Sequence, residues 1–419
     1  MNNKNKVQNL SFTILGCGSS GGVPRLSDGW GLCDPNNIKN SRLRCSLLIT
    51  HETNSGKSWY LIDTSPDLRQ QLLNSKINYM IGGGFGGMLA AARLKDAGIH
   101  DVRIIEKGGG FGGTWYWNRY PGASCDIESY VYFPMLEKTG FVPRQKYTNA
   151  PETLEYCEVL AERFDLHDNA LMQTEVISTE WDEDARRWLV TTNRQDCLKA
   201  RFVVHSNGPL NRPKLPAIKG ISSYKGHTFH TSRWDYAYTG GDSHGNLDNL
   251  SDKRVAIIGT GATAVQCIPH LGAGAKELFV FQRTPSSVDV RDQRETTTEE
   301  RDAWASEPGW ARARRARFAK ISAGRTAMQA NDDYLAGKTK DFKQRKSFDR
   351  ELTMEELVQK QLESNFRIME QIRARVDQIV EDPKTAAALK PYYPYGCKRP
   401  TFHDEYLPTF NQPHVTLVD

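Results

Sequence analysis

A glycine-rich segment, residues 82–87, has the spacing of a turn that binds the pyrophosphate of a dinucleotide. Gly82, Gly84 and Gly87 fit the pattern G-x-G-x-x-G, and a helix-like run and a short strand ending on Glu106 follow. Glycine lets the backbone turn tightly and approach a pyrophosphate, while the start of the next helix supplies N–H donors. Glu106 lies 24 residues after Gly82, about where a ribose-binding carboxylate is needed. A turn without a ligand is the alternative, and the order strand–turn–helix–strand–acid favours the dinucleotide.

A second segment has the same design but a different ending. Gly259 and Gly261 fit G-x-G-x-x-A after an apolar strand-like run, and the next such run leads to Arg283 and Thr284 instead of an acid. A carboxylate there would repel the 2′-phosphate of NADPH, whereas arginine can bind it through two donors. We therefore expect NADPH, with an ordinary surface arginine as the alternative. One site ending in acid and one in arginine indicate FAD and NADPH held face to face, as hydride transfer from nicotinamide to flavin requires.

Three further motifs resemble those of the Baeyer–Villiger monooxygenases and their flavin-containing monooxygenase relatives. Residues 112–126 match [AG]-G-x-W-x(4)-[FY]-P-[GM]-x(3)-D at every defined position. Residues 224–235 match F-x-G-x(3)-H-x(3)-W-[PD], with tyrosine for the first phenylalanine, and their tryptophan–aspartate ending favours the Baeyer–Villiger branch. The pair Lys398-Arg399 is similar to the paired lysine and arginine of the family's active site. The resemblance covers about 80–419.

The resemblance implies a role for each matching residue. The FAD adenosine and pyrophosphate would be held by Gly82, Gly84, Gly87 and Glu106. Beside the flavin would lie Thr114, Trp115, Asp126 and Tyr132. NADPH would be held by Gly259, Gly261, Arg283, Thr284 and Lys398. The catalytic residues would be Arg399 and Asp126, which orients it.

The chemistry that the family carries out explains these residue types. Reduced flavin and O2 give a C4a-peroxide, which attacks a ketone carbonyl and leads to an ester or lactone. A fixed guanidinium stabilises the anionic species, because arginine keeps its proton. A buried carboxylate holds that guanidinium in place. The small-molecule substrate is thus a ketone, with O2 as co-substrate; oxidation of an amine or sulfide, and an inactive truncated fusion, are the alternatives.

These residues must be positioned by an α/β fold with two Rossmann-like dinucleotide-binding domains and a helical insertion. We expect the first part of the FAD-binding domain at 80–215 and the NADPH-binding domain, with the linker motif, at 216–291. The glycine-poor, charged stretch 292–389 has helical period, for example over 354–380. We expect 390–419 to return to the NADPH domain through a strand at 415–418, ending before the rest of the FAD domain.

The first 79 residues do not follow this pattern and form an incomplete β-rich fragment. Strand-like runs lie at 12–15, 46–50 and 59–62, and the glycine–serine loop 16–22 resembles the start of a metallo-β-lactamase-fold hydrolase. That fold needs H-x-H-x-D-H for its metals, and none of the ten histidines stands in such a cluster. We expect no metal here, and a metal-dependent hydrolase is the disfavoured alternative.

Composition excludes several other classes. With 38% apolar and 25% charged residues, no membrane-length apolar run and no signal-like N-terminus, the chain is expected to be cytoplasmic and to have no membrane partner. The eight cysteines contain no C-x-x-C pair, which indicates reduced thiols. Part of the net charge of +5 comes from one basic cluster, which contains Arg312, Arg314, Arg315, Arg317 and Lys320. We interpret this cluster as a solvated helix face without a nucleic-acid partner.

Overall fold

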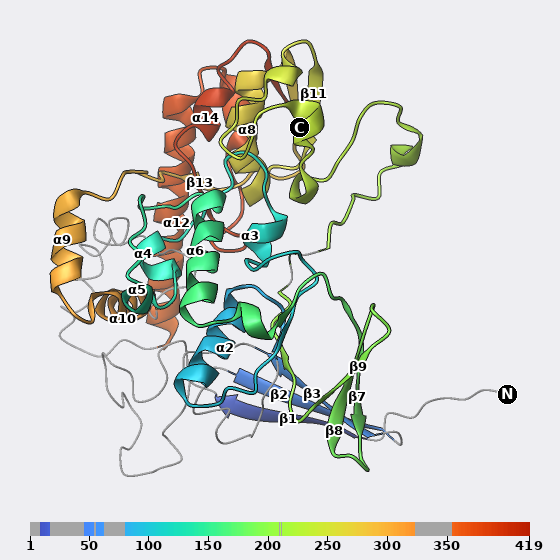
Figure 1. The fold of residues 1–419 in the computed structure, drawn as a ribbon. Helices are drawn as coiled ribbons and strands as arrows, with labels where there is room; N and C mark the ends of the chain where they lie inside the picture. Colours follow the sequence, from blue (N-terminus) through green and yellow to red (C-terminus); the bar gives the residue numbers. More distant parts are fainter. Residues whose placement is uncertain are drawn as a thin grey trace.

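The structure is a computed structural model of the chain and describes residues 9–16, 46–53, 56–62, 80–208, 210, 212–322 and 354–419. Two parallel sheets with packed helices form two units, one beginning at each glycine turn (Figure 1). Two antiparallel sheets and a group of helices flank them. The expected α/β architecture is confirmed.

The first unit is a parallel sheet of short strands in the order β10-β4-β5-β6. Its elements are β4 (Met80–Ile81), α2 (Phe85–Asp96), β5 (Ile104–Ile105), α6 (Ala150–Arg163), β6 (Ala170–Leu171) and β10 (Val204–His205). Helix α2 follows the glycine turn and buries Met88, Ala91 and Leu94 against Ile104 and Val204. This apolar contact fixes the start of α2 above the carboxyl ends of β4 and β5, where ligands bind in such sheets.

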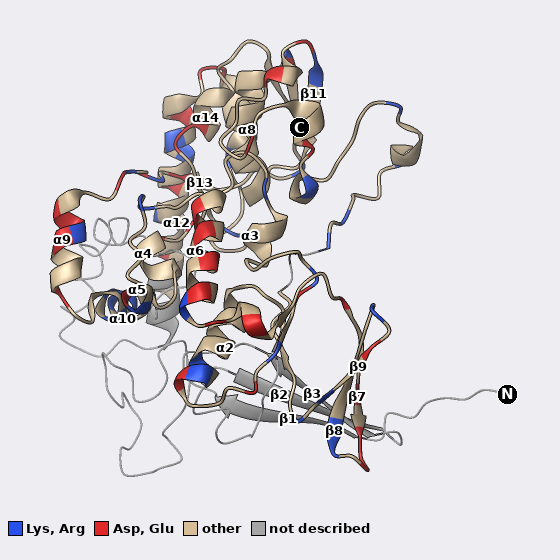
Figure 2. Ribbon diagram, viewed as in Figure 1, with Lys and Arg blue, Asp and Glu red and all other residues tan. Residues whose placement is uncertain are grey.

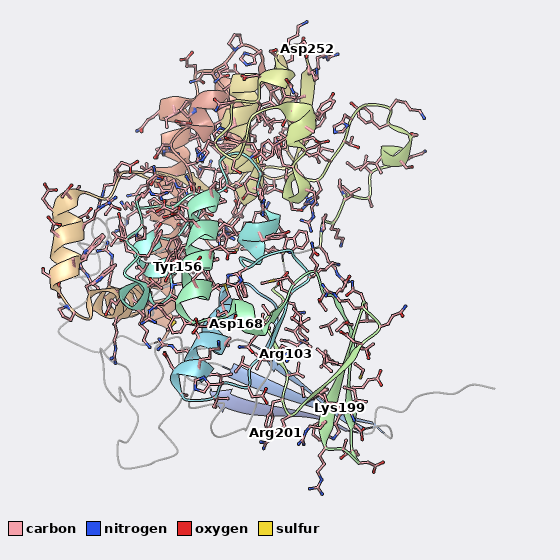
Figure 3. All side chains as sticks on the ribbon, in the orientation of Figure 1. Arg103, Tyr156, Asp168, Lys199, Arg201 and Asp252 are labelled. Carbon is pink, nitrogen blue, oxygen red and sulfur yellow. The ribbon has the colours of Figure 1, made fainter. Side chains whose placement is uncertain are left out.

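Aromatic side chains fill the space between α6 and the short helices α3 (Thr114–Trp117), α4 (Ser129–Tyr132) and α5 (Leu136–Thr139). Tyr156 of α6, labelled in Figure 3, is fully buried and stacks on Phe133 with ring centroids 4.7 Å apart. Asn149 begins α6 by accepting a hydrogen bond from the backbone N–H of Glu152. The packing holds the segment 112–132 against the glycine turn.

The second unit contains β11 (Arg254–Ile258), α8 (Ala262–Gly274), β12 (Glu277–Phe281), α14 (Tyr406–Thr409) and β15 (Val415–Val418). Its strands pair in parallel in the order β11-β12-β15, so the predicted strand at 415–418 is confirmed and joins this sheet. Helix α8 buries Val265, Ile268 and Leu271 in the core of this unit. In Figure 1 this unit lies above the first one.

Two antiparallel sheets lie at the other end of the molecule. One contains β7 (Val176–Asp182), β8 (Arg187–Thr192) and β9 (Cys197–Ala200). The other contains β1 (Asn9–Gly16), β2 (Ser46–Thr53) and β3 (Gly56–Ile62) in the order β1-β2-β3. The three strands expected in the first 79 residues are thus confirmed. Strand β3 contacts β10 and lies beside β7, as Figure 1 shows for β7.

The expected helical stretch contains α9 (Thr298–Ser306), α10 (Trp310–Ser322), α12 (Met354–Ile379) and α13 (Pro383–Leu389). Helix α12 confirms the helix predicted over 354–380, and residues 323–353 lie outside the described part. A parallel pair of two-residue strands, β13 (Val288–Asp289) and β14 (Thr401–Phe402), brings the ends of this stretch together. Among the described helices, none is long and apolar enough to cross a membrane.

The interpretation of the basic cluster as a solvated helix face is wrong in part. The cluster lies on α10 (Figure 2), and Arg312 and Arg317 are exposed. Arg314, however, is 23% exposed and donates to the fully buried carboxylate of Glu128, and Arg315 is half-buried. Helix α10 packs against α4, and a carboxylate buried at that contact requires a cation. The side chain of Lys320 lies outside the described part.

Candidate nucleotide and catalytic site

The first glycine turn is built by close backbone contacts. Gly82 has a φ of +117°, and a Cβ there would lie 2.5 Å from the carbonyl oxygen of Ser206. A Cβ on Gly87 would lie 1.9 Å from the carbonyl oxygen of Gly82, so any side chain would force α2 away from β4. Gly84 immediately precedes α2 as its N-cap. These contacts explain in steric terms why the pattern needs glycine.

Glu106 connects this turn to the next glycine-rich loop. Its side chain is buried, and its two carboxylate oxygens accept hydrogen bonds of 2.6 Å from the backbone N–H groups of Gly83 and Gly108. Each oxygen keeps further acceptor capacity, since an ionised carboxylate offers about four acceptor sites. Glu106 therefore sits where a ribose hydroxyl can reach it, at the wall of a cavity.

That cavity has a volume of about 590 Å³ and opens above the first glycine turn. Of the residues predicted to bind FAD, the cavity is lined by Gly82, Gly84, Glu106, Thr114, Trp115 and Tyr132. Gly87 lies one residue beyond the lining, inside α2. The indole N–H of Trp115 donates to the Tyr132 hydroxyl at 3.0 Å, and their rings meet edge to face. This pair gives the cavity a rigid aromatic end.

The cavity fits a flavin nucleotide on two observations. The hydroxyl oxygen of Ser206 is buried beside the turn and has no hydrogen-bond partner in the described part of the chain. Buried polar atoms without partners are uncommon in proteins, and a ligand group can satisfy this one. The start of α2 carries no side-chain cap, so its N–H donors remain available to a pyrophosphate.

The second glycine turn is open on its outer side. A Cβ added to Gly259, whose φ is +100°, or to Gly261 would meet no atom within 4 Å. The hydroxyl of Thr260, between them, donates to the carbonyl oxygen of Thr284 at 3.1 Å. This contact places Arg283 and Thr284 beside the turn, as a site for the phosphates of a dinucleotide requires.

Arg283 and Lys398 come to this turn from opposite ends of the helical stretch. Both side chains are exposed. The Lys398 ammonium lies 5.2 Å from the ring centre of Tyr393, whose hydroxyl donates to the carbonyl oxygen of Pro285. Lys398 is thereby held near Pro285, two residues after Arg283.

Asp126 of the first unit lies where the two units meet, in contact with three residues of the second. The amide of Gln266 on α8 donates to its Oδ1 at 3.1 Å, and Arg399 donates from Nη2 to its Oδ2 at 3.3 Å. Arg291 lies on the Oδ1 side, with its Nη2 3.8 Å away. The structure therefore brings together the two residues predicted to be catalytic, which are 273 positions apart.

Burial and two neighbouring cations act in opposite directions on the charge of Asp126. Burial raises the pKa of Asp126, while the charges of Arg291 and then Arg399 and the bond from Gln266 oppose that shift. Burial also raises the pKa of Tyr132, and the charge of Arg399 partly opposes this shift. The Arg399 side chain is 55% exposed and so is accessible to a substrate.

Sequence reasoning missed three residues of this site, Ser206, Gln266 and Arg291. Gln266 had a usable signal, because it is a polar residue within the apolar run of α8. Ser206 and Arg291 follow short strands, where no periodicity marks one side chain as functional. Their roles depend on contacts between segments far apart in the chain.

Comparisons with known proteins agree with these two units. A family model described as pyridine nucleotide-disulphide oxidoreductase matches residues 79–300. A Baeyer-Villiger monooxygenase of Stachybotrys chlorohalonatus is 48% identical, over 87% of this chain and 59% of that protein. The neopentalenolactone D synthase of Streptomyces avermitilis is 49% identical, over 81% of this chain and 57% of that protein.

Solved structures are similar over the same part. The polycyclic ketone monooxygenase from Thermothelomyces thermophila gives a TM-score of 0.71 at 42% identity, covering 82% of this chain and 58% of its own. A complex of OTEMO with FAD and NADP gives a TM-score of 0.65 at 31% identity, covering 82% of this chain and 65% of its own. The chain spans less than two thirds of the length of each of these relatives.

Proposed function

Since the chain belongs to the pyridine nucleotide-disulphide oxidoreductase family and matches Baeyer–Villiger monooxygenases over most of its length, we propose that it binds FAD and NADPH and oxygenates ketones. The reaction inserts one oxygen atom of O2 beside a ketone carbonyl and gives an ester or lactone. The roles proposed for individual residues follow from their positions in the structure.

The observation that carries this proposal is the contact between Arg399 and Asp126. Arg399 comes from the segment that returns to the second unit, and Asp126 from the segment that lines the first. A guanidinium held by a buried carboxylate can stabilise negative charge that develops on the carbonyl oxygen of a ketone. Arginine suits this task, since it stays protonated in proteins and its planar fork is held by one carboxylate.

Each cofactor has a set of residues that fits it. When bound and reduced by the nicotinamide, the flavin supplies with O2 the oxygen that is transferred. Gly82, Gly84, Gly87 and Glu106 would hold its adenosine and pyrophosphate. Thr114, Trp115 and Tyr132 line the cavity and would lie by its ring, as would Asp126, which lies outside the lining. NADPH would be held by Gly259, Gly261, Arg283, Thr284 and Lys398.

The proposed domain boundaries follow from the same assignment. An FAD-binding part at 80–215 contains the first sheet, and an NADPH-binding part at 216–291 contains β11, α8 and β12. The helices between 292 and 389 form an insertion, after which 390–419 returns through β15. A cytoplasmic location stays a prediction.

For residues 1–79 we propose a metallo-β-lactamase-like fragment that holds no metal. The antiparallel order β1-β2-β3 is compatible with this origin. None of the ten histidines of the chain stands in the H-x-H-x-D-H cluster that this fold needs for its metals. Elemental analysis of the purified protein tests the proposal, and stoichiometric zinc, iron or manganese would refute it.

The experiment that tests the main proposal starts from the visible spectrum of the purified protein in excess FAD. A flavin spectrum that bleaches on anaerobic addition of NADPH supports both nucleotide sites. Aerobic incubation with a cyclic ketone and, separately, a thioether then separates ketone oxygenation from sulfur oxidation. A protein that retains no flavin, or bleaches without forming ester, would contradict the proposed reaction.

A further inference from the structure

We propose that Arg291 is a positioning residue that holds the Asp126 carboxylate in the orientation in which it binds Arg399. This inference rests on the proposed function of Arg399. Nothing in the motifs that identify the family includes Arg291, and it is the most buried cation beside Asp126, with 7% of its side chain exposed. By comparison, the Arg399 side chain is 55% exposed.

The contacts of Arg291 join the two segments that carry the pair. Its Nη2 donates to the carbonyl oxygen of Cys125, the residue before Asp126. Its Nη1 donates to the carbonyl oxygen of Phe402, three residues after Arg399, at 3.4 Å. One planar guanidinium therefore sets the distance between these segments, and it faces Asp126 Oδ1 at 3.8 Å at the same time.

The backbone of Arg291 is itself held on both sides. Its N–H donates to the Asp404 carboxylate at 2.9 Å, and β13 ends two residues before it, paired with β14. Its guanidinium also lies 5.1 Å from the ring centre of Tyr147. Three different segments, around Cys125, Tyr147 and Phe402, thus fix Arg291, which is the arrangement expected of a residue that orients another.

Arg291 stabilises the ionised form of Asp126 more than Arg399 does. A buried carboxylate takes up a proton unless a cation compensates for the lost solvation. The charge of Arg291 is the largest influence that lowers the pKa of Asp126, ahead of Arg399. The nearby Cys125 thiol is neutral, because burial raises its pKa to about 12. The charge of Arg291 therefore favours the ionised form of Asp126, whose Oδ2 accepts from Arg399.

Arg375 provides a matched control. It is a half-buried arginine whose Nη1 and Nη2 donate to the carbonyl oxygens of Val288 and His403, so it makes the same kind of backbone contacts in the same region. No contact joins it to Asp126 in the described part of the chain. Replacing Arg375 therefore shows the effect of general destabilisation. Replacing Arg291 shows, in addition, the effect of losing the cation beside Asp126.

The test measures the titration of Asp126 in the whole chain by NMR, with ¹³C-labelled aspartate carboxyls assigned through Asp126→Asn. Arg291→Met, Arg291→Lys and Arg375→Met are compared with the parent, and thermal unfolding identifies folded variants. We expect Asp126 to titrate at higher pH in Arg291→Met, less so in Arg291→Lys, and as in the parent in Arg375→Met. Should Arg291→Met not fold, Arg291→Lys decides. An Asp126 titration unchanged in the folded Arg291 variants would overturn the inference.

A second measurement connects this titration to the reaction. In Arg291→Met, the ester formed per NADPH consumed should fall about tenfold or more, because a misplaced catalytic group loses its alignment with the substrate. Arg375→Met should keep the parent ratio. If the parent itself forms no ester, the proposed function fails, and the Asp126 titration still decides whether Arg291 holds the carboxylate.

Discussion

Replacing Arg399 by alanine separates its catalytic effect from its effect on stability. Its contact with Asp126 is 3.3 Å long and involves a side chain that is 55% exposed. Exposed ion pairs contribute about 1 kcal/mol or less, and Asp126 keeps Arg291 and Gln266 as partners after the change. The free energy of unfolding should therefore fall by no more than about 1 kcal/mol.

The loss of rate should be larger. A preformed donor at a developing oxyanion is worth a factor of about a hundred or more, which corresponds to about 2.7 kcal/mol in the barrier. In the proposed reaction, flavin reduction by NADPH precedes this step and does not require Arg399. Arg399→Ala should still bleach the flavin, and the NADPH consumed in air should appear as hydrogen peroxide. Arg399→Lys should recover little, since an ammonium lacks the planar fork that Asp126 holds.

The assay combines urea unfolding, anaerobic bleaching, and gas chromatography of the ester with a peroxide measurement. We expect Arg399→Ala to change the free energy of unfolding little and to reduce ester formation strongly. Ester formation within about tenfold of the parent would remove Arg399 from the mechanism, because this lies below the range for such donors. A stability loss well above about 1 kcal/mol would show instead that the residue serves the fold.

Three other predictions follow from described contacts. Arg283→Ala or Lys398→Ala should weaken NADPH binding by about 1.5–3 kcal/mol and leave NADH almost unaffected, and KM values for both nucleotides test this. Arg314→Met should lower the free energy of unfolding by about 1.5–3 kcal/mol in a urea titration, because it removes a cation that donates to the buried Glu128 carboxylate. Burial lowers the pKa of His403 from 6.5 to about 4, so the unfolded chain binds more protons between these values. Stability should be complete above pH 6.5 and fall by up to about 3 kcal/mol towards pH 4, and His403→Asn should remove this dependence.

Much of the fold was predictable because its signals are local. The apolar run before each glycine turn predicted a strand, and β11 lies where the run at 255–258 indicated. Alternation of helix-like and strand-like runs predicted parallel sheets, and the period over 354–380 predicted α12. Strand lengths were less predictable: the first unit uses two-residue strands, such as β5 at Ile104–Ile105.

The basic cluster on α10 shows why the local sequence does not predict which side chains are buried at contacts between helices. Five cations within nine residues indicate a solvent-facing helix on composition alone. Arg314 turns inward because Glu128, 186 positions away, is buried beneath it. Neither residue carries information about the other in its own neighbourhood, so only the packed structure assigns the ion pair.

The sequence by itself determined the two nucleotide-binding units and the kinds of cofactor that they suit. In each unit the glycine turn and the residue that marks the cofactor, Glu106 in the first and Arg283 in the second, lie within about 30 residues of each other. Over so short a stretch, the strand–turn–helix–strand geometry leaves little choice of position. Tertiary structure alone decided how Asp126 is held, because Gln266, Arg291 and Arg399 reach it from separate segments, the nearest of them 140 positions away. Hydrogen bonds and buried charges depend on distances of a few ångströms, and only folding of both units against each other sets those distances.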